Sequence, residues 1–207
     1  MASHSLQNLS CQYCKRSAEA DIYTSVNRQE DPELLEELTS GRLFVWQCPH
    51  CGGSNLVQRP FMYHDPAGRH MIWLCTEDGV EERVSQMFRD DETLSAYTAR
   101  VVDSVGDLIE KVKIFDAGLD DIVVEMVKYV TRLEIGVEAK GLRFLRTDGA
   151  DNEITLAYPK DGQMEMLAVG FNVYEDCAGI LQRNPHIRQM ATGLVRIDAA
   201  WIERFFK

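Results

Sequence analysis

The sequence predicts an α+β fold in two parts. In the first part, residues 1–90, apolar and polar residues alternate at the period of half-buried strands, and one short helical segment is inserted. The second part, residues 91–207, opens with a short strand and two apolar stripes at helical spacing and continues with three strand-like runs separated by turns. We place the domain boundary near residue 90, where the acidic stretch "RDDE" follows a short amphipathic helix.

The expected elements of the first part begin with a strand and a helix. Residues 18–26 alternate between apolar and polar side chains, which predicts a strand that ends near Asn27. Asp31 as N-cap, Pro32 at the first helical position and Gly41 as a stop then predict a short helix. The following "RLFVWQC" returns to a composition typical of strands.

Residues 61–75, "FMYHDPAGRHMIWLC", predict a β-hairpin. We expect "DPAG" to form its turn, with Gly68 in the left-handed conformation. In that register His64 and His70 face each other across the strands. Two neighbouring histidines beside Asp65 are able to bind a metal or to act in acid/base chemistry, whereas histidines on a solvated hairpin face have neither role.

The second part is expected to contain a helical hairpin and an antiparallel sheet. A strand, "YTARVV", precedes Ser104, which has an aspartate three residues later, as in a capping box. Apolar residues at helical spacing predict one helix that ends at Gly118 and a second helix packed against it. Three runs within residues 142–171 predict an antiparallel meander. Asn172 and Asp198 are expected to cap the last two helices.

Composition and charge limit the classes of partner. The 207 residues are 45% hydrophobic and 27% charged, with a net charge of −11. Residues 1–75 carry 6 Lys and Arg against 8 Asp and Glu, and the remainder carries 16 against 25. This balance argues against a general nucleic-acid binder, because such affinity comes mainly from neutralised phosphates. No stretch reaches the roughly 18 apolar residues of a membrane span, and we expect a cytoplasmic protein without membrane association.

Four of the six cysteines form two Cys-x-x-Cys pairs, and 33 residues separate the pairs. Two thiolates three positions apart around a tight turn both reach one ion at about 2.3 Å, and a second such turn completes a tetrahedron. The sequence therefore predicts a zinc-ribbon-like β module that holds one structural Zn²⁺. Iron in a rubredoxin-like site remains an alternative occupant. The expected metal ligands are Cys11, Cys14, Cys48 and Cys51.

The second pair, "CPHC", is also the active-site tetrapeptide of a thiol oxidant, so a redox role has to be considered. A redox motif places its first cysteine at the N-terminus of a helix, where the pKa of the thiol is lowered. Gly52 and Gly53 follow the motif and favour a turn with positive φ over a helix. This favours metal binding over a redox dithiol. We expect His50, inside the motif, to point outward and not to bind the metal.

The two cysteine pairs, "DPELLEEL", "CPHCG" and "YHDP" together resemble the CpXC domain, a bacterial and archaeal domain named for paired Cys-Pro-x-Cys motifs. The resemblance spans roughly residues 9–110, and the downstream "LIEKVKIFDAGLDDIVVEMVK" is also similar to such proteins. It implies metal binding by the four paired cysteines but no particular process. The first motif departs from the family pattern, because it reads "CQYC" and is followed by Lys15 and Arg16.

The expected function is interaction with another protein. Four protein ligands leave no coordination position for water, and phosphate-binding loops, G-x-S-x-G and H-E-x-x-H are absent from the sequence. We therefore expect no catalytic residues; the sequence leaves the oligomeric state open. One alternative is an enzyme with its site around His64, His70 and the groove between the domains. Another is a ribbon that contacts nucleic acid through basic and aromatic residues, namely Lys15, Arg16, Arg42, Trp46 and Arg59.

Overall fold

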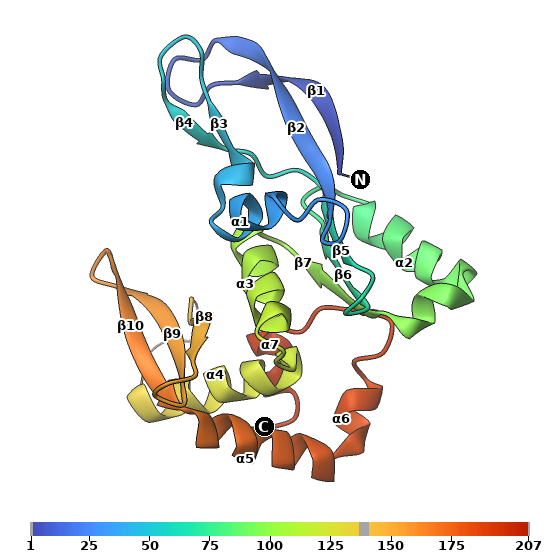
Figure 1. Cartoon of the computed structure of the whole chain (residues 1–207), viewed down its shortest axis with the longest axis vertical. Coiled ribbons are helices and arrows are strands. Elements are labelled where there is room, and N and C mark those ends of the chain that lie inside the picture. Colours follow the sequence, from blue (N-terminus) through green and yellow to red (C-terminus); the bar gives the residue numbers. More distant parts are fainter. Residues whose placement is uncertain (1, 137–140, 207) are drawn as a thin grey trace. The chain divides into compact units, whose positions relative to one another are not determined.

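The computed structural model describes residues 2–136 and 141–206 (Figure 1). The fold is mixed α+β, as the sequence predicts. The chain groups into two compact units that divide between Ile109 and Glu110, within helix α3 (Val105–Asp116). Among the described residues, no helix has the length and apolar character needed to cross a membrane.

In the first unit, five strands are hydrogen-bonded in the order β1-β2-β5-β6-β7. The β1–β2 and β5–β6 pairs are antiparallel, whereas β2–β5 and β6–β7 are parallel. A separate antiparallel hairpin is formed by β3 and β4. The strands are β1 (Ser3–Ser10), β2 (Ser17–Asn27), β3 (Val45–Gln47), β4 (Ser54–Leu56), β5 (Phe61–Asp65), β6 (His70–Leu74) and β7 (Thr98–Val102). The helical segments are α1 (Leu34–Thr39), η1 (Arg42–Phe44), α2 (Val80–Asp90) and η2 (Glu92–Ala96).

Strand β7 lies beyond the domain boundary expected near residue 90. It nevertheless pairs with β6 along its whole length, from His70 opposite Thr98 to Leu74 opposite Val102. The strand is therefore part of the sheet of the first unit. The division into domains 1–90 and 91–207 is a statement about independent folding and stays a prediction.

The expected helix caps are found at two of four positions. Ser104 and Asp198 accept hydrogen bonds from first-turn N–H groups of α3 and of the last helix, as predicted. The Asp31 carboxylate instead accepts the N–H of Asn27 at 3.1 Å, and α1 begins three residues later than Asp31. Asn172 lies inside its helix, which begins without a side-chain cap.

The register of the β5–β6 hairpin differs from the predicted one. Asp65 pairs directly with His70, so the loop is one residue shorter than assumed. Because side chains alternate between the faces of a strand, His64 and His70 lie on opposite faces of the sheet. The predicted juxtaposition of the two histidines is therefore wrong. The left-handed residue of the turn is Arg69, with φ 55°, and not Gly68.

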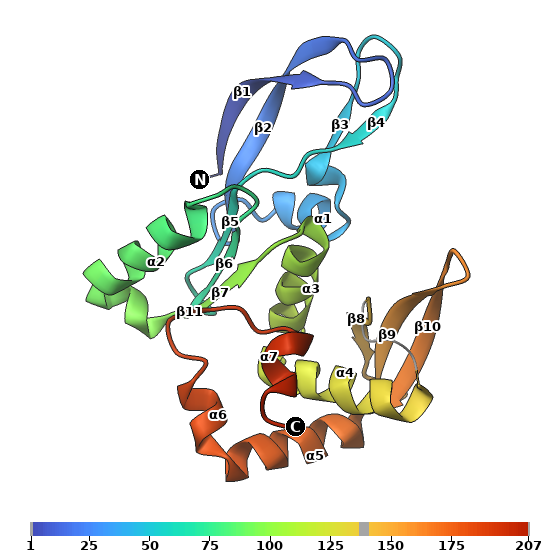
Figure 2. The ribbon, with the colours of Figure 1, turned by 180° about the vertical axis from the view of Figure 1, so that it is seen from behind.

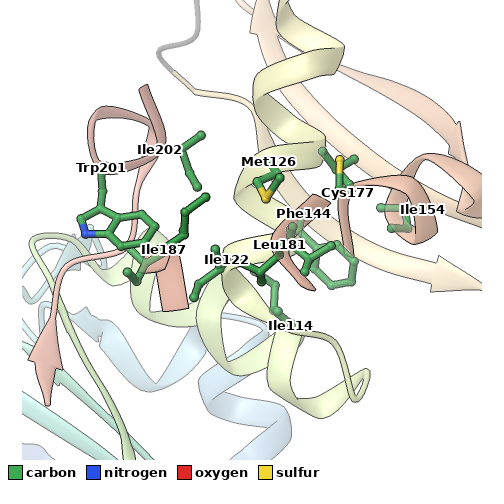
Figure 3. Close-up of a cluster of buried hydrophobic side chains, with 14 of the residues drawn as sticks. Ile114, Ile122, Met126, Phe144, Ile154, Cys177, Leu181, Ile187, Trp201 and Ile202 are labelled. Carbon is green, nitrogen blue, oxygen red and sulfur yellow. The ribbon is translucent and has the colours of Figure 1, made fainter. Parts of the chain in front are cut away.

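The second unit contains the predicted antiparallel meander, in the order β10-β9-β8, together with helices (Figure 2). Its core includes Met126, Phe144, Cys177 and Leu181, which come from two helices and one strand (Figure 3). Each of these four side chains is buried. The further elements are α4 (Asp121–Ile135), β8 (Arg143–Asp148), β9 (Glu153–Lys160), β10 (Gln163–Gly170), α5 (Phe171–Arg183), α6 (Pro185–Gln189), β11 (Leu194–Val195) and α7 (Ala199–Glu203).

Candidate metal centre

The four paired cysteines lie in two hairpin turns that meet. Cys11 and Cys14 are in the turn between β1 and β2, and Cys48 and Cys51 are in the turn between β3 and β4 (Figure 1). All four Sγ atoms lie within 4.8 Å of one another. None of the four takes part in a disulfide. The structure thus brings the four predicted residues into a group that could hold one metal ion.

The spacing of the sulfur atoms fits a single tetrahedral ion. With metal–sulfur bonds of about 2.3 Å, the sulfurs of a tetrahedron are about 3.8 Å apart. The Sγ atoms of Cys11 and Cys51 are separated by 3.6 Å, and those of Cys14 and Cys48 by 3.7 Å. Both pairs join one turn to the other, so an ion between the sulfurs would connect the two hairpins.

The two cysteine turns have the same backbone hydrogen bonds although their sequences differ. The carbonyl of Cys11 accepts the N–H of Lys15 at 3.0 Å, and the carbonyl of Cys48 accepts the N–H of Gly52 at 2.8 Å. Each first cysteine also donates its own N–H to the carbonyl five residues later, at 2.9 and 3.0 Å. The two turns therefore share one backbone conformation.

Lys15 takes the place of a glycine in the first turn. Its φ of 61° is close to the φ of 70° at Gly52, the equivalent position in the second turn. A residue with a Cβ atom adopts this left-handed conformation at a cost of about 1–2 kcal/mol. Lys15 therefore adds strain to the first turn but does not change the shape of that turn.

Asn55 connects the two turns, and sequence reasoning missed it. This residue of β4 is only 4% exposed. Its Oδ1 accepts the N–H of Gln12 at 2.8 Å, while its Nδ2 donates to the carbonyl of Gly53 at 2.8 Å and to Sγ of Cys11 at 3.6 Å. The run Gly52-Gly53-Ser54-Asn55 is typical of a turn, so the sequence carries no signal for this long-range role.

The surroundings of the sulfurs favour the thiolate form of Cys11 and oppose the thiolate form of Cys51. The N–H groups of Cys14 and Tyr13 and the amide of Asn55 lower the pKa of Cys11 to about 6, against the effect of burial. The Gly53 N–H acts in the same direction on Cys51, but burial and the three neighbouring thiols raise the pKa of Cys51 to about 11. Four thiolates at this spacing repel one another, and a bound cation removes that repulsion.

The cysteines and their neighbours in the two turns differ in exposure and in contacts. Cys11 and Cys48 are buried, whereas Cys51 is exposed. The ring of Tyr13 lies so close to Gly53 that a Cβ atom there would be 2.6 Å from the ring. His50 is not in the sulfur group, and its Nε2 lies 3.3 Å from the carbonyl of Ser17, on strand β2.

The two histidines of the alternative enzyme site lie in separate environments. The Nε2 of His64 is 3.2 Å from the hydroxyl of Tyr97, and burial lowers the pKa of His64. The Nδ1 of His70, on the other face, is 3.7 Å from a carboxylate oxygen of Asp65. They form no joint site, so this arrangement gives the enzyme alternative no support.

Carboxylates engage two arginines of the alternative nucleic-acid surface. Arg42 lies within 3.1 Å of Glu36 and within 2.9 Å of Glu37. Arg59 lies 3.2 Å from Glu77. These ion pairs reduce the positive charge that the ribbon offers to phosphates, so contact with nucleic acid also gains no support from the structure.

Two hairpin turns with converging sulfurs define a ribbon-like domain with a four-cysteine group. The model of the family described as CpXC protein matches residues 9–128, which is more than half of the chain. The chain therefore belongs to the CpXC family. The matched segment continues through α3 into α4, so the family domain extends well beyond the cysteine-bearing hairpins. No match was found among curated proteins or among solved structures.

Proposed function

We propose that this chain is a structural zinc protein, in which one Zn²⁺ bound by Cys11, Cys14, Cys48 and Cys51 stabilises the first unit for interaction with another protein. The mutual approach of the four sulfurs from two equivalent turns carries the proposal. Four thiolates fill the tetrahedral coordination of zinc and leave no position for water, which favours a structural role over a catalytic one.

The small core of the ribbon explains why a metal is needed there. In the part of the chain that the structure describes, the buried residues beside the turns form a small cluster against which the partly buried Trp46 packs. An isolated two-stranded hairpin such as β3–β4 is marginally stable in water. Binding of structural zinc supplies on the order of 10–16 kcal/mol that adds to folding. The buried members of the cluster are Leu9, Ala20, Ile22 and Val57.

The charges of the first turn suit a four-thiolate site. Zn²⁺ with four thiolates leaves a net charge of about −2. Lys15 and Arg16 follow Cys14 directly and offset this charge. Because thiolate ligands must stay reduced, we place the protein in a reducing compartment such as the cytoplasm.

Removal of the metal tests the proposal. Amide hydrogen exchange is measured on the purified full chain before and after treatment with a chelator, and again after zinc is restored. We expect exchange to accelerate across residues 9–75 without metal, to remain slow in α4 and α5, and to recover with zinc. Unchanged exchange across residues 9–75 in the metal-free chain would overturn the structural role. Bound iron in the purified protein would overturn the choice of zinc.

A further inference from the structure

A groove of about 340 Å³ lies beside the cysteine turns, within the first unit. The end of β1, the first cysteine turn, β3 and the segment from β4 onward contribute to its lining. Most of the lining residues have polar side chains or an aromatic ring, among them Asn8, Gln12, Trp46, Asn55, Gln58 and Arg59. The groove thus offers mainly hydrogen-bonding groups, beside one aromatic ring and the aliphatic side chains of Leu9, Leu56 and Val57.

Two strands that line the groove have an unpaired edge. Strand β1 is the outermost strand of its sheet, and β4 pairs only with β3 among the described residues. Residues 8–10 of β1 and residues 55–56 of β4 are part of the lining. An unpaired strand edge offers N–H and C=O groups to an extended peptide, which binds by adding a strand.

The side chains of the groove also suit a peptide. Trp46 packs against the small ribbon core and lines the groove at the same time. The carboxamides of Asn8, Gln12 and Gln58 make no hydrogen bond to any other described residue. A carboxamide carries both donors and an acceptor, so it can pair with the N–H and the C=O of a peptide.

The charge of the groove distinguishes a peptide from a nucleic acid. Arg59 is the only charged residue among the described residues that line the groove, and its side chain is 47% exposed. One guanidinium nitrogen contacts Glu77 at 3.2 Å. An arginine has five N–H donors, so others are left for an acidic side chain. One cation in a chain with net charge −11 does not suffice for a polyanion.

We propose that this groove binds an extended segment of a partner protein as an added β-strand, with an acidic side chain at Arg59 and an apolar one against Trp46. The inference rests on the proposed protein-interaction function and names the chemistry of the partner. Asn55 lines the groove and also joins the two cysteine turns, so the metal centre fixes the shape of the groove.

A phage-displayed library of random peptides of about twelve residues, selected on the immobilised zinc-loaded full chain, provides the probe. We expect enriched peptides that lack proline and combine an acidic residue with an apolar one at fixed spacing. Synthetic versions are then N-methylated at alternate positions. Only one of the two alternating sets of N–H groups faces a strand edge, so one set of methylations should abolish binding and the other should not. Failure of enrichment, or equal effects of both sets, would overturn the added strand.

Charge reversal locates the binding site. Arg59→Glu should weaken binding of the selected peptide by about tenfold or more, and replacing the peptide's acidic residue with lysine should restore it. Arg42→Glu is the matched control, since Arg42 is also a half-exposed arginine of this unit paired with glutamates but is not part of the groove lining. Equal weakening by both variants would overturn the site. If a labelled oligothymidylate binds at physiological salt and Arg59→Glu weakens this binding equally, the ligand of the groove is single-stranded nucleic acid and the peptide proposal is overturned.

Metal content measured on the same samples separates this inference from the proposed function. One zinc per chain without peptide binding would overturn the peptide groove alone. A folded chain without metal would overturn the structural zinc, whatever the peptides do.

Discussion

Lys15 is strained in the first cysteine turn, because it has the left-handed conformation that Gly52 has in the second turn. The left-handed conformation of Lys15 costs about 1–2 kcal/mol, and a glycine would avoid this cost. Glycine would also give the unfolded chain more freedom, which lowers the free energy of unfolding by about 0.5–1 kcal/mol. We therefore expect Lys15→Gly to stabilise the first unit by about 0.5–1 kcal/mol. The change in the free energy of unfolding is measured by denaturant unfolding of the zinc-loaded chain, with amide exchange in β2 as the probe of the first unit.

The control for this prediction is Lys15→Ala, which removes the same charge but keeps a Cβ atom in the left-handed conformation. It should give no stabilisation. A gain of the same size in both variants would show that the charge, and not the backbone, is responsible.

Asn55 is the residue that sequence reasoning missed, and its amide should influence the affinity for metal. Asn55→Asp keeps the shape of the side chain but replaces the donor to Cys11 Sγ with a negative oxygen. Loss of such an outer partner typically lowers metal affinity by about 10–100-fold, and we expect a decrease in this range. Competition with a chromophoric zinc chelator measures it.

Gln7→Glu makes the same amide-to-carboxylate change in the same module, on a side chain whose amide contacts Ser5. It should leave the affinity within about twofold of the original. A similar decrease in both variants would indicate a general effect of charge.

At the scale of elements, the β5–β6 hairpin depends on Gly68. A Cβ atom there would lie 2.5 Å from Oδ2 of Asp65 and 2.7 Å from Nδ1 of His70. Both side chains are largely buried, so neither can move away cheaply. We expect Gly68→Ala to destabilise the chain by about 1–3 kcal/mol, measured by chemical denaturation.

Gly149→Ala, in the turn between β8 and β9, is the matched control. Its added Cβ atom would meet nothing within 4 Å, and the residue has no positive φ. The change should stay within about 0.5 kcal/mol. A large effect at Gly149, or none at Gly68, would contradict the packing of the hairpin turn.

Local signals in the sequence predicted most elements, because strand alternation, helical stripes and caps such as Ser104 act within a few residues. The grouping of the four cysteines was also predictable, since two residues in one turn already fix half of a tetrahedral site. The hairpin register was not, because loops of four and five residues fit "DPAGR" equally well, and one residue moves His70 to the other face. The role of Asn55 depends on contacts that only the folded chain makes.

At the scale of the whole molecule, loss of one metal ligand should affect the two units differently. We expect Cys14→Ser to unfold residues 9–75 and to leave α4 and α5 folded, because the core of the second unit contains none of the paired cysteines. Hydrogen exchange with mass spectrometry checks both regions. The control is Cys75→Ser, because Cys75 is a cysteine of the first unit that lies outside the sulfur group. This variant should retain one metal per chain.

Cys177 reports on the second unit in the same experiment. Burial, with a smaller contribution from Asp176, raises the pKa of this thiol to about 11, so about one molecule in a thousand holds the thiolate at pH 8. Cys177 should therefore resist iodoacetamide in the Cys14→Ser variant until denaturant unfolds the second unit. The stability that comes from the neutral thiol is present below pH 9 and is lost as pH rises towards 11. Rapid labelling of Cys177 at pH 8 would mean that the units unfold together.

X-ray absorption at the zinc edge, on full chain purified without added zinc, tests the four-cysteine site most directly. We expect about one zinc per chain, bound by four sulfur atoms at about 2.3 Å and by no nitrogen or oxygen. A folded chain without stoichiometric metal, or one with a disulfide between Cys48 and Cys51, would contradict the structural zinc centre.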